Sequence, residues 1–380
     1  MMSRVRVFVT SFAALALVGR ASAATGTLRD RGVQPSGSET EQEPAKLPWR
    51  GSSLTWDHSV TTQTLGLGGD YQSRNPTYEM TFRLAPRYYF FDQRERSLSL
   101  RADVRLLREF TDSDSTTERG EWTFADSELS LTGLQTVYRD PGSRSQLVLR
   151  LPTLIFPTSK TSALGGRILG LGLGVGLDQE LTLLGKNAPA LLSAVLRPRF
   201  NYSYQFAEAV VATNDRIDRI RLDSDGRSLP SDQLTGSTLP QHQLSASLRG
   251  ELSLTPKLVL EAELGARYAR RYRLPATTLC VANGCAEVPA RSDATRWGVT
   301  TLFSTALSFE LGELLELSAG YANLSPELGA DGRRRNVLYS PEARVFVALS
   351  VALDSLYQTA SGQTPRLATH DARTRVAPSY

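Results

Sequence analysis

Apolar residues alternate with small or polar residues along most of the chain from about residue 52 onward. The alternation is clearest in RSLSLRADVRLL, SQLVLRLP, LGLGLGVGL, KLVLEAELGARYA and ARVFVALSVAL. A period of two is the period of a β-strand, whose successive side chains point to opposite faces. We therefore predict an all-β chain with about twelve strands, near residues 53–63, 77–91, 97–110, 123–137, 145–155, 167–178, 190–206, 241–254, 258–272, 295–309, 314–323 and 343–357.

The segments between these strands alternate in length. Short turns, DQRER, YRDPGS, LTPK and ELGE, join four of the strand pairs, whereas most other connectors are longer and the longest covers residues 207–240. An even number of strands, with short turns at one rim and long loops at the other, is the plan of a transmembrane barrel in a bacterial outer membrane. We predict an antiparallel up-and-down barrel of this kind, with the short turns and both termini on the periplasmic side.

The two faces of each predicted strand differ in chemistry. In residues 258–272, Leu258 and Leu260 share one face with Tyr268, while Glu261 and Glu263 share the other. A soluble β-sandwich also separates residues in this way, and that alternative stays open when one strand is considered alone. Aromatic residues near both ends of the apolar faces are typical of a barrel that meets two membrane interfaces. We therefore expect lipid outside and a lumen inside.

Charged residues collect on the inward face of the predicted strands. A charge on the lipid-facing side costs about 2–4 kcal/mol at the middle of the membrane, so charges are expected to line the lumen instead. The arginines are expected to set the electrostatic field and the carboxylates to counter it, with a weak preference for anions. The predicted lumen residues are Arg101, Asp103, Arg105, Arg150, Arg197, Arg199, Arg249, Glu261, Glu263 and Arg267.

Glycines occupy every second position of one strand, in ILGLGLGVGL at residues 168–177. A dinucleotide-binding loop needs the spacing G-x-G-x-x-G before a helix. This stretch lacks the two-residue gap between the second and the third glycine of that motif. We predict that its leucines face lipid and that its glycines leave a bare inner wall. Side chains from facing strands, a loop folded inward or a ligand could fill that space. The four positions are Gly170, Gly172, Gly174 and Gly176.

The two ends of the chain differ from the middle. Arg4 and Arg6 precede an apolar run that ends near Ala21-Ser22-Ala23, which is the pattern of a secretory signal peptide, with a membrane anchor as the alternative. We predict a signal peptide at 1–23, a flexible periplasmic segment at 24–51, the barrel at 52–357 and a polar periplasmic tail at 358–380. Without the signal peptide, 40 basic residues face 39 acidic ones, which argues against binding of nucleic acid.

Few residues are candidates for other chemistry. Cys280 and Cys285 flank an Asn-Gly turn and are expected to form a disulfide, with a metal site as the alternative. Neighbours on a strand point to opposite faces, so His58 cannot join both Asp57 and Ser59 in a catalytic triad. No G-x-S-x-G motif occurs. We predict no catalytic residue, no metal and no cofactor.

From about residue 52 to residue 357 the chain resembles bacterial outer-membrane β-barrel proteins of the porin-like kind. The resemblance rests on the signal peptide, the alternation, the connector lengths and a final strand, VFVALSVALDSLY, that ends on Tyr357; the polar tail after it departs from the usual form. It implies a narrow passive channel for small polar or ionic solutes. Outer-membrane lipid and the barrel assembly machinery are the expected partners, and periplasmic or extracellular protein partners stay open. The alternative is a plugged barrel that acts as a receptor, adhesin or structural partner through its long loops.

Overall fold

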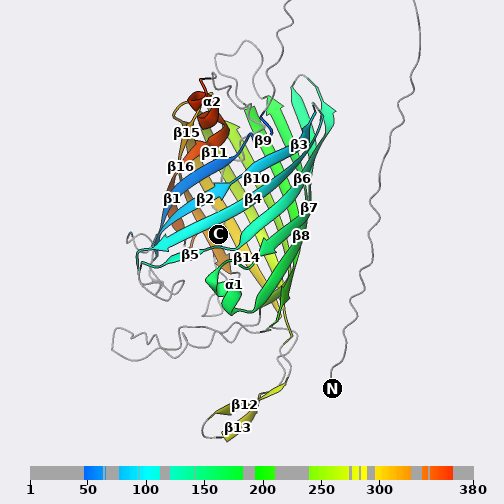
Figure 1. The fold of residues 1–380 in the computed structure, drawn as a ribbon, viewed down its shortest axis with the longest axis vertical. Coiled ribbons are helices and arrows are strands. Elements are labelled where there is room, and N and C mark those ends of the chain that lie inside the picture. Colours follow the sequence, from blue (N-terminus) through cyan, green and yellow to red (C-terminus); the bar gives the residue numbers. More distant parts are fainter. Residues whose placement is uncertain are drawn as a thin grey trace, which may run out of the picture. The chain divides into compact units, whose positions relative to one another are not determined.

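Twelve antiparallel strands form a closed barrel in the computed structural model (Figure 1). This confirms the predicted fold class. The structure describes residues 47–62, 65, 77–93, 95–111, 120–140, 142–182, 193–208, 210, 239–273, 276–281, 284–288, 296–326, 336–340 and 343–362. The predicted signal peptide and most of the segment at 24–51 therefore lie outside the described residues.

Two of the twelve barrel strands are interrupted, so the barrel contains fourteen strand segments. Pro86 separates β2 from β3, and Ala125 and Asp126 separate β5 from β6. A proline has no N–H to donate to a neighbouring strand, which explains the first interruption. The segments are β1 (Ser53–Thr61), β2 (Tyr78–Ala85), β3 (Arg87–Asp92), β4 (Arg96–Glu109), β5 (Trp122–Phe124), β6 (Ser127–Arg139), β7 (Ser143–Phe156), β8 (Arg167–Thr182), β9 (Ser193–Ala207), β10 (Pro240–Ser253), β11 (Leu258–Arg271), β14 (Trp297–Glu310), β15 (Leu315–Pro326) and β16 (Arg344–Ala352).

Neighbouring strands pair in chain order, and the first strand closes the barrel. β1 pairs with β16, where Ser53 lies opposite Ala352, and also with β2, where Ser53 lies opposite Ala85. The interrupted second strand then pairs with β4 through both β2 and β3. Every barrel strand thus has a partner on each side, as a membrane-spanning sheet requires, because an unpaired backbone group in lipid is costly.

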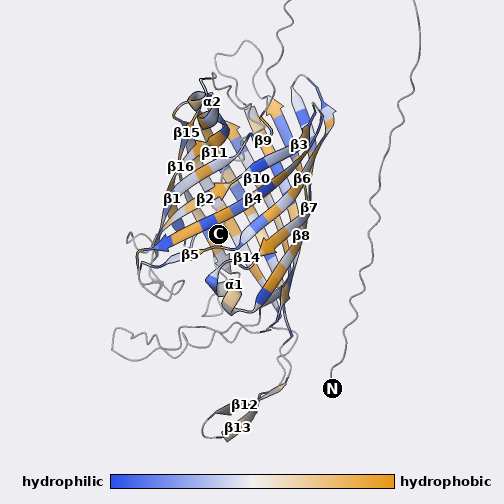
Figure 2. Cartoon of the chain, viewed as in Figure 1, coloured by the Kyte–Doolittle hydropathy of each residue, from blue (hydrophilic) through white to orange (hydrophobic). Residues whose placement is uncertain are grey.

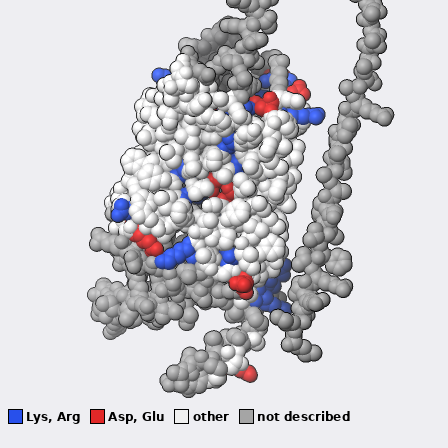
Figure 3. Space-filling view, in the orientation of Figure 1, with Lys and Arg blue, Asp and Glu red and all other residues white. Residues whose placement is uncertain are grey.

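The outer surface of the barrel is apolar. Leu171, Leu173 and Val175 on β8 are all exposed, with 39%, 50% and 43% of their surface accessible. Figure 2 shows hydrophobic and hydrophilic residues alternating along the barrel strands. In the space-filling view most of the described surface is uncharged, and charges gather near the two ends, with a small group of both signs between them (Figure 3). This surface matches the predicted lipid-facing band.

Exposed aromatic residues lie near both ends of this band. At the long-loop end, Tyr78 stacks with Phe110, and its hydroxyl lies 2.9 Å from Nδ1 of His58. At the short-turn end, Tyr88 and Phe90 are exposed and pack edge to face. Aromatic girdles at both rims are typical of membrane interfaces. The fold is therefore a transmembrane β-barrel of the outer-membrane type.

The short turn between β6 and β7 is held by one carboxylate. The hydroxyl of Tyr138 donates to Asp140 at 2.6 Å, and the backbone N–H of Gly142 donates to the same side chain at 2.8 Å. The Tyr138 hydrogen bond and then that of Gly142 lower the pKa of Asp140 below its ordinary value. The carboxylate therefore accepts these hydrogen bonds at neutral pH.

The last strand ends five residues earlier than predicted. β16 stops at Ala352 and the chain continues as helix α2 (Leu353–Ala360), so Tyr357 is helical and is no strand terminus. Asp354 is buried and accepts a hydrogen bond from the backbone N–H of Gly51 at 3.1 Å, and Tyr357 packs edge-on against Trp49. The contacts with the segment before β1 favour a helix over further strand. The predicted end of the last strand at 357 is therefore wrong.

Two elements lie outside the barrel sheet in addition to α2. The short helix α1 (Lys160–Leu164) connects β7 to β8, and neither helix is long and apolar enough to cross a membrane. A separate hairpin consists of β12 (Thr277–Val281) and β13 (Gly284–Val288). In its register Cys280 lies opposite Cys285, which is disulfide-bonded.

Candidate functional site

The lumen contains a cavity of about 280 Å³ between two walls of the barrel. One wall comes from β3, β4, β6 and β7, and the other from β8, β9, β10 and β11. The lining positions lie from the middle of these strands toward their short-turn ends. The lining residues are Arg87, Arg101, Thr132, Leu134, Val148, Arg150, Asp178, Arg197, Arg199, Asn201, Ser247, Arg249, Glu251 and Glu263.

Ion pairs run across four neighbouring strands of the second wall. Asp178 on β8 pairs with Arg199 and lies 3.7 Å from Arg197 Nε on β9. Arg197 pairs with Glu251 on β10. Arg249 Nε lies 3.3 Å from Glu251, and its Nη2 donates to Glu261 Oε2 on β11 at 2.5 Å. We call these six residues the ion-pair chain: Asp178, Arg197, Arg199, Glu251, Arg249 and Glu261.

The first wall carries arginines without such partners. In the part of the chain that the structure describes, Arg87, Arg101 and Arg150 form no ion pair with a carboxylate within 4.0 Å. Arg87 donates from Nε to Ser99 Oγ at 3.2 Å, and its guanidinium lies 4.5 Å from the ring centre of Tyr89. Arg101 lies directly opposite Arg87 in the strand register. We call Arg87, Arg101 and Arg150 the open arginines.

The charge around the cavity is unbalanced. Six arginines and three carboxylates line it. The ion-pair chain neutralises its own cations, because it contains three arginines and three carboxylates. The excess positive charge therefore comes mainly from the open arginines. Fixed charges in a partly desolvated cavity act more strongly on a nearby ion than they would in bulk water.

Side chains fill the space over the glycine row of β8, and they come from the neighbouring strands β7 and β9 rather than from a facing wall. A Cβ at Gly176 would lie 2.5 Å from Cδ of Arg199, and one at Gly170 would lie 2.6 Å from Oε1 of Gln205. Gly170, Gly174 and Gly176 leave room for polar side chains of β9, whereas a Cβ at Gly172 would first meet Thr153 of β7 and a backbone oxygen. The absence of a Cβ at Gly176 makes room for Arg199, which pairs with Asp178.

Filling the glycine row is expected to disturb the ion-pair chain. We expect Gly176→Val to displace Arg199 from Asp178, because the new Cβ would also lie 2.8 Å from the backbone oxygen of Pro198. Overpacking of this kind costs about 1–3 kcal/mol. The temperature at which the folded band disappears in a heat-modifiability gel should fall. Gly133→Val on β6 is the matched control, since its Cβ would meet nothing within 4 Å, and it should leave that temperature unchanged.

The structure separates the predicted lumen residues into groups. The cavity brings together Arg101, Arg150, Arg197, Arg199, Arg249 and Glu263. Glu261 belongs to the ion-pair chain. Asp103 and Arg105 lie in another cluster, in which Asp103 accepts hydrogen bonds from Arg83 Nε at 2.8 Å and from Arg105 Nε at 2.9 Å. Arg267 belongs to none of these groups.

Two charged residues at the cavity, Arg87 and Asp178, were not among the charged residues predicted on the inward faces. Counting every second residue along the strands could have found them. Arg87 follows Arg83 at an even spacing in the predicted strand at 77–91, and Asp178 lies two residues after Gly176, the last glycine of the row. Glu251 lies two residues from Arg249, and this spacing does predict it on the inward face. The pairing of these residues depends on cross-strand register, which the sequence pattern does not contain.

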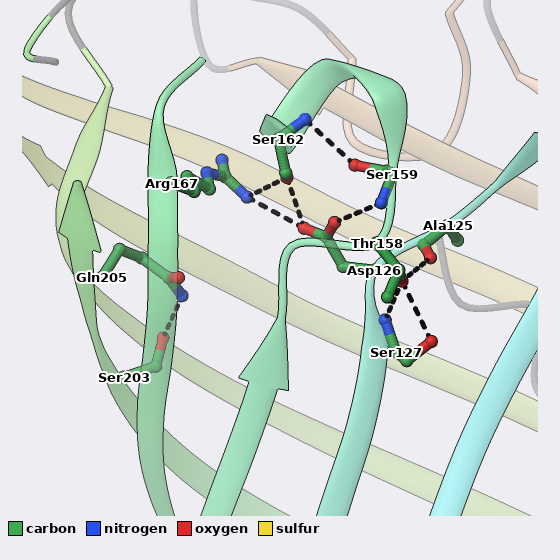
Figure 4. Close-up of polar contacts among 9 residues, drawn as sticks. All are labelled: Ala125, Asp126, Ser127, Thr158, Ser159, Ser162, Arg167, Ser203 and Gln205. Carbon is green, nitrogen blue, oxygen red and sulfur yellow. Dashed lines mark hydrogen bonds and ion pairs between the residues drawn. The ribbon is translucent and has the colours of Figure 1, made fainter. Parts of the chain in front are cut away.

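A second polar cluster fixes the connection between β7 and β8 at the opposite end of these strands (Figure 4). Asp126 Oδ2 accepts hydrogen bonds from Ser162 Oγ at 2.6 Å and from Arg167 Nη1 at 3.1 Å. Its Oδ1 accepts the backbone N–H of Ser159 at 3.1 Å. One carboxylate thus joins the β5–β6 interruption to helix α1 and the start of β8, and this keeps the connector in place.

Removing the Asp126 carboxylate is expected to loosen this connector. Asp126→Ala leaves three donors without their acceptor, at a cost of about 1–3 kcal/mol, and partial exposure places the effect at the lower end. We expect faster proteolysis within residues 157–166 under limiting protease. Glu128→Ala is the control, because Glu128 lies two residues away and forms no side-chain hydrogen bond or ion pair among the described residues. Equal proteolysis of the two variants would contradict this role.

The described histidines lie on the outer face and not at the cavity. His58 contacts Tyr78, and His242 Nδ1 lies 2.8 Å from the hydroxyl of Tyr202. Among the described residues, no group of three or more His, Cys, Asp or Glu side chains is arranged to hold a metal ion. The charged groups that line the cavity are arginines and carboxylates.

Comparison with known proteins gives similarity in fold alone. No family model and no curated protein matches the chain. Among solved structures, an outer membrane channel from Pseudomonas putida F1 is 13% identical, with a TM-score of 0.44 over 84% of this chain and 99% of that one. The KdgM porin is 6% identical, with a TM-score of 0.33 over 79% and 98%. Outer membrane phospholipase A from Escherichia coli is 11% identical, with a TM-score of 0.33 over 79% and 91%. At these values no activity or substrate is transferred to this chain.

Proposed function

We propose that this protein is a narrow passive channel of the bacterial outer membrane for small polar or ionic solutes, with a preference for anions. The observation that carries the proposal is the cavity in the lumen, which six arginines and three carboxylates line. The open arginines attract anions, and the ion-pair chain keeps the opposite wall charged without a net attraction for either sign. The lipid-facing band around the barrel supports a route across the membrane through this cavity.

The same proposal includes an orientation and a maturation path. The short turns and both termini lie on the periplasmic side, and the long connectors lie outside, as in barrels of this plan. Residues 1–23 serve as the signal peptide, and the polar tail predicted at 358–380 lies on the periplasmic side. The barrel assembly machinery inserts the chain, as it does other outer-membrane barrels.

Reversal potential in a salt gradient tests the proposed preference. The refolded protein is inserted into a planar lipid bilayer with tenfold more potassium chloride on one side. We expect stable conductance steps whose current reverses at a potential of the sign set by chloride. A current that reverses at the potassium sign would contradict the role of the open arginines. A protein that inserts and never conducts would contradict the channel itself and favour the plugged-barrel alternative.

A further inference from the structure

The wall of the cavity contains one apolar patch. Leu134 on β6 and Val148 on β7 lie directly opposite each other in the strand register. They are the two apolar side chains among the described residues that line the cavity. Their neighbours on the same inward faces, Thr132 and Arg150, are polar and also lie opposite each other. The patch is therefore a local departure from a polar lining.

Cations adjoin this patch on both sides. Arg150 stands two residues from Val148 on the same face of β7, and Arg199 lies over Gly176, which is the cross-strand neighbour of Val148. Arg150 forms no ion pair with a carboxylate among the described residues. An anionic group can therefore bind guanidinium nitrogen atoms while an attached apolar body contacts Leu134.

The size of the cavity limits what fits. Water occupies about 30 Å³ per molecule in the liquid. A cavity of about 280 Å³ therefore holds a compact organic molecule of roughly ten non-hydrogen atoms. Ligand pockets commonly measure about 300–1,000 Å³, so this cavity lies at the small end of that range.

We propose that the cavity is a binding site for small organic anions in which a carboxylate is joined to a compact apolar body. This inference rests on the proposed channel, because the ligand reaches the cavity along the lumen. A carboxylate matches the planar donor geometry of guanidinium groups. The apolar body displaces water from Leu134 and Val148, which favours such an anion over a hydrophilic one of equal charge.

Block of the chloride current by benzoate and by formate tests the site, because the two ions share a charge and a carboxylate and differ in the apolar body. In the native protein we expect the half-blocking concentration of benzoate to be at least tenfold lower than that of formate. The double variant Leu134→Thr with Val148→Thr should bring this ratio close to one. The variant Thr132→Val extends the patch and should increase the ratio without changing block by formate.

Each outcome of this recording is decisive. Equal block by the two anions in the native protein overturns the proposed site while the channel stands, since the same recording shows the chloride current. A high ratio that neither variant changes also overturns it, because the preference then arises elsewhere. If the double variant does not fold, Thr132→Val alone decides. Absence of any current overturns the proposed channel and the proposed site together.

Discussion

We expect replacement of Arg101 and Arg150 together by glutamate to reverse the proposed preference for anions to a preference for cations. The cavity then carries four arginines and five carboxylates in place of six and three. A unit charge interacts with an ion about 7 Å away by roughly 1 kcal/mol at a dielectric between that of water and that of a protein surface. Two reversed charges therefore change the ratio of anion to cation permeability by more than about tenfold. The sign of the reversal potential in a salt gradient measures the change.

The control for this variant carries the same change in net charge away from the cavity. Arg139 and Lys257 are both exposed at the short-turn end, and neither lines the cavity. Arg139→Glu with Lys257→Glu should leave the sign of the reversal potential unchanged. An equal shift in both double variants would mean that net charge at the mouth sets selectivity, and the cavity would lose its assigned role.

Replacing Glu251 by glutamine is expected to destabilise the barrel and to strengthen its preference for anions. Glu251 is 6% exposed and contacts both Arg197 and Arg249, so its loss leaves two guanidinium groups without their shared carboxylate. Removing one partner of a buried ion pair costs about 3–5 kcal/mol. Part of this cost is recovered here, because Arg197 is 21% exposed and water in the lumen reaches it. The heat-modifiability temperature should fall, and the reversal potential should move toward that of chloride.

The variant Glu263→Gln separates the effect on stability from the effect on ion selectivity. Glu263 lines the same cavity, and the structure gives it no ion pair among the described residues. Its replacement changes the charge of the cavity by the same amount as Glu251→Gln. We expect a similar shift of the reversal potential with little change in the heat-modifiability temperature. If both variants lose stability equally, the ion-pair chain does not hold the second wall in the way described.

The strands could be predicted from the sequence, because a lipid-facing surface and a charged lumen impose the alternation directly. The alternation does not distinguish a strand from a helix where the apolar positions fit the periods of both. In residues 353–357 the apolar positions suit a strand and also a short helix, and the contacts of Asp354 with Gly51 favour the helix. These contacts join residues about 300 positions apart in the chain, so no local pattern contains them.

The inward faces were predictable, whereas the contacts made on them were not. The alternation of inward and outward positions predicted Arg199 in the lumen. Only the register between β8 and β9 shows that Arg199 lies over Gly176. The same register pairs it with Asp178, which the prediction omitted. A one-residue change in register would alter every such contact, and sequence alternation leaves the register open among positions of equal parity. The balance between paired and open arginines therefore required the structure.

The most direct test is whether the current passes through the cavity. Ser247 lines it and is replaced by cysteine, which adds little volume, while the native disulfide at Cys285 leaves no free cysteine in the described part of the chain. A negatively charged methanethiosulfonate reagent is then added during single-channel recording. We expect each conductance step to fall sharply on reaction, and Ser361→Cys, exposed at the end of α2, to show no change. An unchanged current through a fully reacted Ser247→Cys protein would contradict conduction through this cavity.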